Sequence, residues 1–161
     1  LGWYKVHKPV EYYAAYFTVR SENLDGAIAM QGHQAVRDKM NNIKQKQSVH
    51  EATAKDEAEF QTLQIVNEMM ARKIEFLPVD IYKSEAKMFK VEDGKIRLPF
   101  SSLPGVGGAA ADSLAETGKH TEYLSIEDMQ IKTKVTKAVI ETLKDVGVLK
   151  DLPESSQMSL F

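Results

Sequence analysis

The residues best suited to chemistry in this chain are three glycines in the segment Leu103 to Leu114. Gly105, Gly107 and Gly108 stand just before a stretch of alanines that we expect to begin a helix. Glycine has no side chain, so such a turn leaves the amides of Gly107, Gly108 and Ala109 free at the positive end of the helix dipole. This pattern predicts a site where the backbone itself binds an anion such as a phosphate.

The apolar residues of the same segment indicate how the turn is held. Val106 is expected to insert between two helices, and Ala111 and Leu114 would let those helices approach closely. This is the arrangement of a helix-hairpin-helix motif, which contacts the DNA backbone without reading base sequence. A dinucleotide fingerprint also uses spaced glycines, but it requires a preceding buried strand and a later strand ending in an acid, and neither is visible. A glycine-rich loop that merely starts a helix remains an alternative.

A second hairpin is predicted further along the chain. Residues 125–132 form a short helix with Ser125 as its N-cap, and residues 137–146 form another, which ends at Gly147. The candidate phosphate-binding side chains at the turn between them are Lys132, Lys134, Thr136 and Lys137. Here cations would replace backbone amides as phosphate partners, with a solvated basic surface as the alternative. Two such hairpins together could hold both strands of a duplex.

The last five residues form a different kind of candidate site. Gln157, Met158, Ser159, Leu160 and Phe161 follow a polar stretch that contains Pro153. An extended peptide of this kind can place its three large apolar side chains in a groove, while the glutamine amide both donates and accepts hydrogen bonds. The pattern predicts an anchor for a partner protein. Folding of the peptide back onto its own core is the alternative.

Helices must position these sites. Pro9 suits the first turn of a helix with an aromatic buried surface, two helical stretches separated near Gly32 follow, and residues 53–73 form the longest helical candidate. Around Phe89 the period changes to alternation, and Asp93-Gly94 makes a two-residue turn. We therefore expect a mainly α fold with one small β-hairpin.

Composition limits the classes of function. The chain has 161 residues, of which 43% are hydrophobic and 27% charged, and its net charge is -2 with a pI near 6.1. These values are typical of a globular protein without an overall positive field, so any nucleic-acid contact must be local. No run of about 18 apolar residues and no signal peptide is present, which favours a cytoplasmic protein without membrane contact. The chain begins at Leu1, in what we interpret as the interior of an element, so we expect a piece of a longer protein.

No catalytic constellation is recognisable. Cysteine is absent, which excludes disulfides, thiolate zinc sites and a cysteine nucleophile. The histidines fall at no ligand-like spacing, and no Asp-x-Asp pair is present to hold magnesium. We expect no catalytic residue, metal or cofactor within this chain.

Four segments together resemble the C-terminal end of PolC-type DNA polymerase III alpha subunits, the replicative polymerases of low-GC Gram-positive bacteria. They are Tyr4 to Arg20 and Phe76 to Ala86, similar to the family's fingers region; Leu103 to Leu114, similar to its duplex-binding hairpin; and Leu152 to Phe161, similar to its clamp-binding tail. Two positions depart from the family pattern. Ala109 replaces a basic residue, which weakens phosphate affinity, and Met158 replaces a leucine, whose pocket it should also fill.

The resemblance implies a division of the chain and a function. Residues 1–96 would belong to a helical fingers region, 97–150 to a tandem helix-hairpin-helix region, and 151–161 to a flexible tail that binds the bacterial sliding clamp. The parent enzyme would add deoxynucleotides with magnesium held by aspartates outside this chain, which alone should be inactive. A stand-alone DNA-binding adaptor with a clamp-binding peptide is the alternative, and a helical scaffold for protein interactions is a third possibility.

Overall fold

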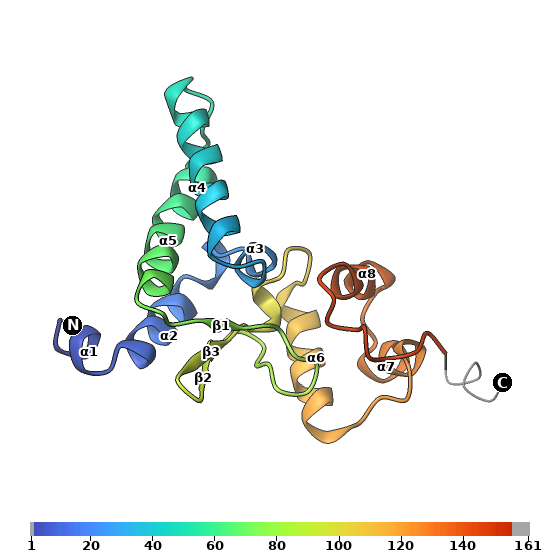
Figure 1. Ribbon diagram of the computed structural model, residues 1–161. Helices are drawn as coiled ribbons and strands as arrows, with labels where there is room; N and C mark the ends of the chain where they lie inside the picture. Colours follow the sequence, from blue (N-terminus) through green and yellow to red (C-terminus); the bar gives the residue numbers. More distant parts are fainter. Residues whose placement is uncertain (1, 156–161) are drawn as a thin grey trace.

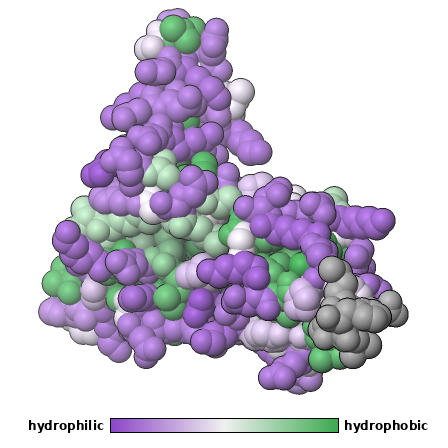
Figure 2. Space-filling view, turned by 45° about the vertical axis from the view of Figure 1, so that its right-hand side comes forward, coloured by the Kyte–Doolittle hydropathy of each residue, from purple (hydrophilic) through white to green (hydrophobic). Residues whose placement is uncertain are grey.

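Helices make up most of the part of the chain that the computed structural model describes, which is residues 2–155 (Figure 1). In chain order the helical segments are α1 (Gly2–His7), α2 (Pro9–Val19), the 3₁₀ turn η1 (Ser21–Asn23), α3 (Gly26–Met30), α4 (His33–Ser48), α5 (Ala54–Ala71), the 3₁₀ turn η2 (Phe100–Ser102), α6 (Gly108–His120), α7 (Ile126–Thr133) and α8 (Lys137–Asp145). Helices α4 and α5 pair and rise away from the rest, and Figure 2 shows a mainly hydrophilic surface over this projection. The predicted fold class is confirmed.

A three-stranded sheet lies between α2 and α6 (Figure 1). Strand β3 (Lys95–Arg97) is central, with β1 (Phe76–Leu77) parallel on one side and β2 (Lys90–Glu92) antiparallel on the other. Asp93 and Gly94 form the turn between β2 and β3 with φ of 50° and 76°, as a two-residue hairpin turn requires. The predicted β-hairpin is confirmed. The sequence did not predict β1, because two residues are too few to show alternation.

Local signals set most helix boundaries. Pro9 is the first residue of α2, and Gly32, with φ of 103°, separates α3 from α4. Thr53 caps α5: its hydroxyl accepts the Asp56 amide at 3.1 Å, while the Asp56 carboxylate accepts the Thr53 amide at 3.0 Å. This reciprocal pair satisfies two amides that the first turn of a helix leaves free. The predicted breaks in the helical pattern are therefore confirmed.

Aromatic side chains join α2 to the sheet. Phe17 is fully buried, and its ring centroid lies 5.4 Å from that of Phe76 and 5.7 Å from that of Phe89. The Thr18 hydroxyl accepts the amide of Phe89 at 3.0 Å. Offset or tilted ring pairs at such distances add about 0.5–1.5 kcal/mol each to the stabilisation by burial. The aromatic surface predicted for α2 thus packs on β1 and on the segment that enters β2.

A polar network joins the first two helices to α5. The Tyr13 hydroxyl donates to Glu68 at 2.9 Å and accepts from Arg72 at 3.0 Å, and the Lys5 ammonium lies 2.6 Å from Glu68. Lys5 holds the pKa of the Glu68 carboxyl below its usual value, mainly through their hydrogen bond. Burial raises the pKa of Tyr13. The network gives the buried tyrosine hydroxyl both of its hydrogen-bond partners.

One close approach positions α6 against the segment that precedes the β-hairpin. A Cβ atom built on Gly118 would lie 2.2 Å from the carbonyl oxygen of Ile81 and 3.5 Å from the Cα of Tyr82. Both neighbours are backbone atoms, so they cannot rotate aside. One residue later, the Lys119 ammonium pairs with Glu85 at 2.8 Å. Only glycine at position 118 therefore lets α6 lie against residues 81–85.

Replacing Gly118 by alanine should destabilise the protein by about 1–3 kcal/mol, because the added methyl forces the backbone of Ile81 away from α6. Chemical denaturation followed by circular dichroism measures the change. Gly107→Ala is the matched control, since a Cβ at Gly107 meets no atom within 4 Å. Equal stability of the two variants would show that the backbone contact at Gly118 is not a constraint.

Candidate nucleic-acid interface

The glycine turn predicted from the sequence forms as a tight bend that ends in α6. Gly105 has φ of 87°, a conformation that side-chain-bearing residues rarely adopt. Val106 follows and is only 6% exposed, and its amide donates to the Leu103 carbonyl at 3.2 Å. Gly107 is the N-cap of α6 with φ of -73°, and Gly108 is the first helical residue. Val106 is buried as predicted, but the predicted insertion between two helices is not seen in that form, because the arm that precedes Val106 is the 3₁₀ turn η2.

The N-terminus of α6 is open. Gly107 supplies no side chain to cap the helix, and within residues 2–155 no hydrogen-bond acceptor is found for the amides of Gly107, Gly108, Ala109 and Ala110. The structure therefore brings together the backbone donors that the sequence predicted. Free amides at a helix start carry the positive end of the helix dipole, which suits them to bind an anion.

The second turn repeats the backbone of the first. Lys134 has φ of 61°, Val135 is 8% exposed, and Thr136 caps α8 by accepting the Val139 amide at 3.3 Å. The sequence Lys134-Val135-Thr136-Lys137 thus corresponds position by position to Gly105-Val106-Gly107-Gly108: a left-handed residue, a buried valine, an N-cap and the first residue of a helix. Both turns have the same shape with different side chains.

The first hairpin differs from an expected pair of helices. Its incoming arm is η2, a 3₁₀ turn of three residues, whereas α7, the incoming arm of the second hairpin, has eight. Pro99 and Pro104 flank η2, and a proline disfavours helical conformation in the residue before it. Leu103 is accordingly extended, with φ of -81° and ψ of 130°. The prolines leave no room for a full helix.

The two hairpins pack against each other. The Ser113 hydroxyl on α6 donates to the Thr133 carbonyl at the end of α7 at 2.5 Å. A Cβ built on Gly105 would lie 3.4 Å from the Thr142 hydroxyl on α8. The turns are therefore held in a fixed relation by contacts that each hairpin makes with the other.

Ion pairing divides the lysines around the second turn into two groups. Lys132 pairs with Asp128 at 2.9 Å, and a hydrogen bond from the Leu124 amide, together with this lysine, lowers the pKa of the Asp128 carboxyl. Lys134 and Lys137 are exposed, and no carboxylate lies within ion-pair distance of either in the part of the chain that the structure describes. These two cations are free to meet an anion, whereas Lys132 already has a partner.

One basic residue near the first turn was not predicted. The Nζ atom of Lys87 lies 3.8 Å from the position that a Cβ on Gly108 would take. Lys87 is exposed and belongs to the segment before β2, outside both hairpins. No periodicity or spacing in the sequence relates it to the glycine turn, so only the fold reveals this proximity.

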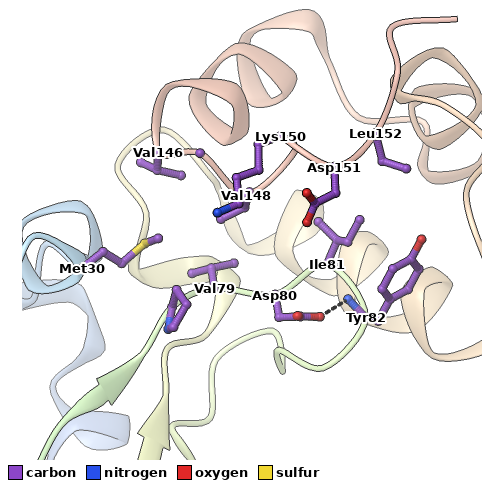
Figure 3. A pocket seen from close by; sticks show the side chains of 12 residues that line it. Met30, Val79, Asp80, Ile81, Tyr82, Val146, Val148, Lys150, Asp151 and Leu152 are labelled. Atoms are coloured by element: carbon purple, nitrogen blue, oxygen red, sulfur yellow. Dashed lines mark hydrogen bonds between the residues drawn. The ribbon is translucent and has the colours of Figure 1, made fainter.

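A cavity of about 500 Å³ separates the sheet region from the C-terminal helices (Figure 3). Val79 and Ile81 line one side, and Val148 and Leu152 the other. The Asp80 carboxylate accepts a hydrogen bond from the Tyr82 amide at 2.8 Å, so this carboxylate already has a partner within its own loop.

Among the described residues no group of three acidic or histidine side chains could hold a metal ion. None of the helices between residues 2 and 155 has the length and apolarity of a membrane span.

A family model described as "Helix-hairpin-helix motif" matches residues 73–158, which is more than half of the chain and includes both turns. The chain belongs to the helix-hairpin-helix family. This membership confirms the motif that the glycine spacing and the second basic turn predicted. It also extends the matched region upstream of both turns to Lys73, so that it contains the sheet.

Several proteins that share one name are similar to this chain over its whole length. DNA polymerase III PolC-type from Thermotoga maritima is 37% identical over 161 residues, and the proteins of the same name from Clostridium perfringens and Halalkalibacterium halodurans are each 40% identical over 161 residues. The matches cover 100% of this chain but only 11–12% of the relatives. The predicted resemblance to PolC-type polymerases is confirmed, and the chain corresponds to a small part of such a protein.

The predicted clamp-binding residues, Gln157, Met158, Ser159, Leu160 and Phe161, lie outside the described residues. The chain just before them is held to α7. The carbonyls of Pro153 and Glu154 accept the amides of Ile126 and Glu127 at 2.8 and 3.1 Å. These bonds fill the N-terminus of α7, so this helix start has no free amides for an anion, in contrast to α6.

Exchanging the residue types at the two left-handed positions should change stability in opposite directions. Gly105→Ala should cost about 1–2 kcal/mol, because a Cβ is strained at this φ. Lys134→Gly removes the same strain and should stabilise the protein by about 0.5–1 kcal/mol after the entropy cost of glycine. Urea denaturation measures both. A Gly105→Ala variant with the same free energy of unfolding as the wild type would contradict the requirement for a left-handed residue in the first turn.

Proposed function

We propose that this chain binds the sugar-phosphate backbone of duplex DNA through its two hairpin turns. The observation that carries the proposal is the repeated turn geometry, with four free amides at the start of α6 and two unpaired lysines, Lys134 and Lys137, at the second turn. Amides and lysine ammonium groups both bind phosphate oxygens, and neither distinguishes one base from another. Binding would therefore be independent of sequence.

The two turns would act on phosphates in different ways. In the first turn, Gly107 and Gly108 carry no side chain that would keep a phosphate oxygen from the amides. In the second turn, the Thr136 hydroxyl already accepts the Val139 amide, so fewer free amides remain than in the first turn, and Lys134 and Lys137 add their positive charges. Because the hairpins are packed together, both contacts would occur on one bound duplex.

We further propose that the chain serves a replicative DNA polymerase. The similarity to PolC-type relatives covers residues 1–72 as well as the helix-hairpin-helix match, which favours a polymerase parent over a separate adaptor. Residues 1–96 would then belong to the fingers region and 97–150 to the duplex-binding region. The parent would use magnesium for nucleotide addition, and this chain alone would not polymerise.

The third part of the proposal is a tether to the bacterial sliding clamp through Gln157, Met158, Ser159, Leu160 and Phe161. Burial of each of the three large apolar side chains stabilises a complex by about 1.5–3 kcal/mol before ordering costs, so the peptide alone binds weakly. The chain is anchored on α7 as far as Glu154, only a few residues before this peptide. A short connection to the DNA contacts raises the effective concentration of the peptide to about the millimolar range and prolongs residence.

For DNA, we expect duplex affinity to fall steeply with salt, and each replacement Lys134→Gln or Lys137→Gln to reduce the slope of log K against log salt by about 0.9. Fluorescence anisotropy with a labelled duplex at several salt concentrations measures the slope. Lys8→Gln is the control, since Lys8 is exposed at the end of the molecule that carries α1 and α2 (Figure 1). A slope that all three variants share with the wild type would exclude the second turn as a DNA contact.

For the clamp, calorimetry should detect binding of the full chain to the sliding clamp of a bacterium that uses a PolC-type polymerase. Deletion of residues 157–161 should abolish that binding, because it removes the three apolar anchors. The same deletion should leave duplex affinity unchanged. Clamp binding that survives the deletion would place the contact elsewhere on the chain and contradict the tether.

A further inference from the structure

Lys87 stands where the first turn lacks a cation of its own. The second turn carries lysines at its left-handed position and at its first helical position, Lys134 and Lys137, whereas glycines occupy both positions in the first turn. The ammonium of Lys87 lies 3.8 Å from the Cβ position of Gly108, the structural equivalent of Lys137. A cation from a distant segment therefore occupies the region that a side chain of the turn occupies in the second hairpin.

The backbone around Lys87 is fixed to the first hairpin. The amide of Phe100 donates to the Glu85 carbonyl at 3.0 Å, and the amide of Ser101 donates to the Ala86 carbonyl at 2.9 Å. Both donors belong to η2, the incoming arm of the first hairpin. The backbone on the N-terminal side of Lys87 is thus hydrogen-bonded to the first hairpin. These bonds keep Lys87 close to the glycine turn.

The charge of Lys87 is available. Within residues 2–155 no carboxylate lies within ion-pair distance of its ammonium. By contrast, Lys119 at the other end of α6 pairs with Glu85, and their hydrogen bond raises the pKa of Lys119. A lysine that keeps no acidic partner gains the full attraction of a phosphate, while a paired lysine must first exchange one contact for another.

We propose that Lys87 is a phosphate-binding residue of the first hairpin and supplies the cation that Gly105, Gly107, Gly108 and Ala109 do not. The inference rests on the proposed function and adds a contact that the hairpin sequence does not contain. A phosphate that accepts hydrogen bonds from the amides of Gly107 and Gly108 would lie within reach of the Lys87 ammonium. The first turn then neutralises charge as the second does, with backbone donors and one cation together.

The test compares variants of the full chain in duplex binding across a salt series. Lys87→Gln should reduce the slope of log K against log salt by about 0.9. The ratio of wild-type affinity to variant affinity should therefore fall about threefold as salt rises from about 50 to 200 mM. Lys87→Arg should keep the wild-type slope, because it keeps the charge. Lys83→Gln is the matched control, an exposed lysine four positions earlier on the same segment. Thermal denaturation should show equal stability for all four proteins.

Each other outcome overturns the inference. If Lys87→Gln binds as the wild type does, or if Lys83→Gln loses as much, Lys87 makes no specific contact, although salt-dependent binding by the wild type would leave the proposed function standing. If the wild type itself shows no salt-dependent binding to duplex DNA, the proposed function and the role of Lys87 both fail.

Discussion

The close approach of α6 to the segment before the β-hairpin is the constraint on which the candidate interface depends. Gly118 lets α6 rest on the backbone of Ile81, and the Lys119–Glu85 ion pair holds the same contact one residue later. From this point α6 runs back to its open N-terminus, while the neighbouring segment continues to Lys87. Because α6 and this segment are joined by one rigid contact, the free amides of α6 and the Lys87 ammonium lie close together.

The two hairpins show how one backbone shape can carry two chemistries. In each turn a left-handed residue reverses the chain, a buried valine anchors the bend, and a helix begins two residues later. Gly105 adopts the left-handed conformation without strain, and Gly107 leaves the amides at the start of α6 without a side-chain cap. Lys134 adopts the same conformation with some strain but adds a charge. The two turns therefore share the packing of Val106 and Val135. The residues around these valines decide whether an anion is bound by backbone amides or by lysine side chains.

Helix capping decides which helix starts are available to a ligand. Asp25, Thr53 and Thr136 cap α3, α5 and α8 with their side chains, and the carbonyls of Pro153 and Glu154, together with a side-chain cap, fill the start of α7. An amide that already donates within the protein offers little to a phosphate. The start of α6 has no such cap, so among the three C-terminal helices it offers the most free donors.

The sequence by itself determined the local features of this protein. Helix breaks at Gly32 and Gly147, the Asp93-Gly94 turn and the glycine turn before α6 all follow from backbone preferences that a few adjacent residues express. Family resemblance was also visible there, because whole segments match. The 3₁₀ arm of the first hairpin could have been foreseen from the two prolines around it, yet the hairpin pattern favoured a full helix.

Only the tertiary structure decided which distant groups meet. Strand β1 exists because β3 offers it a parallel partner, and two residues show no pattern without that partner. The equivalence of Lys134 with Gly105 appears only in the backbone angles, since lysine gives no sign of a left-handed conformation. Lys87 reaches the glycine turn because α6 packs on its segment, and contact between segments far apart in the chain depends on packing, which adjacent residues do not encode.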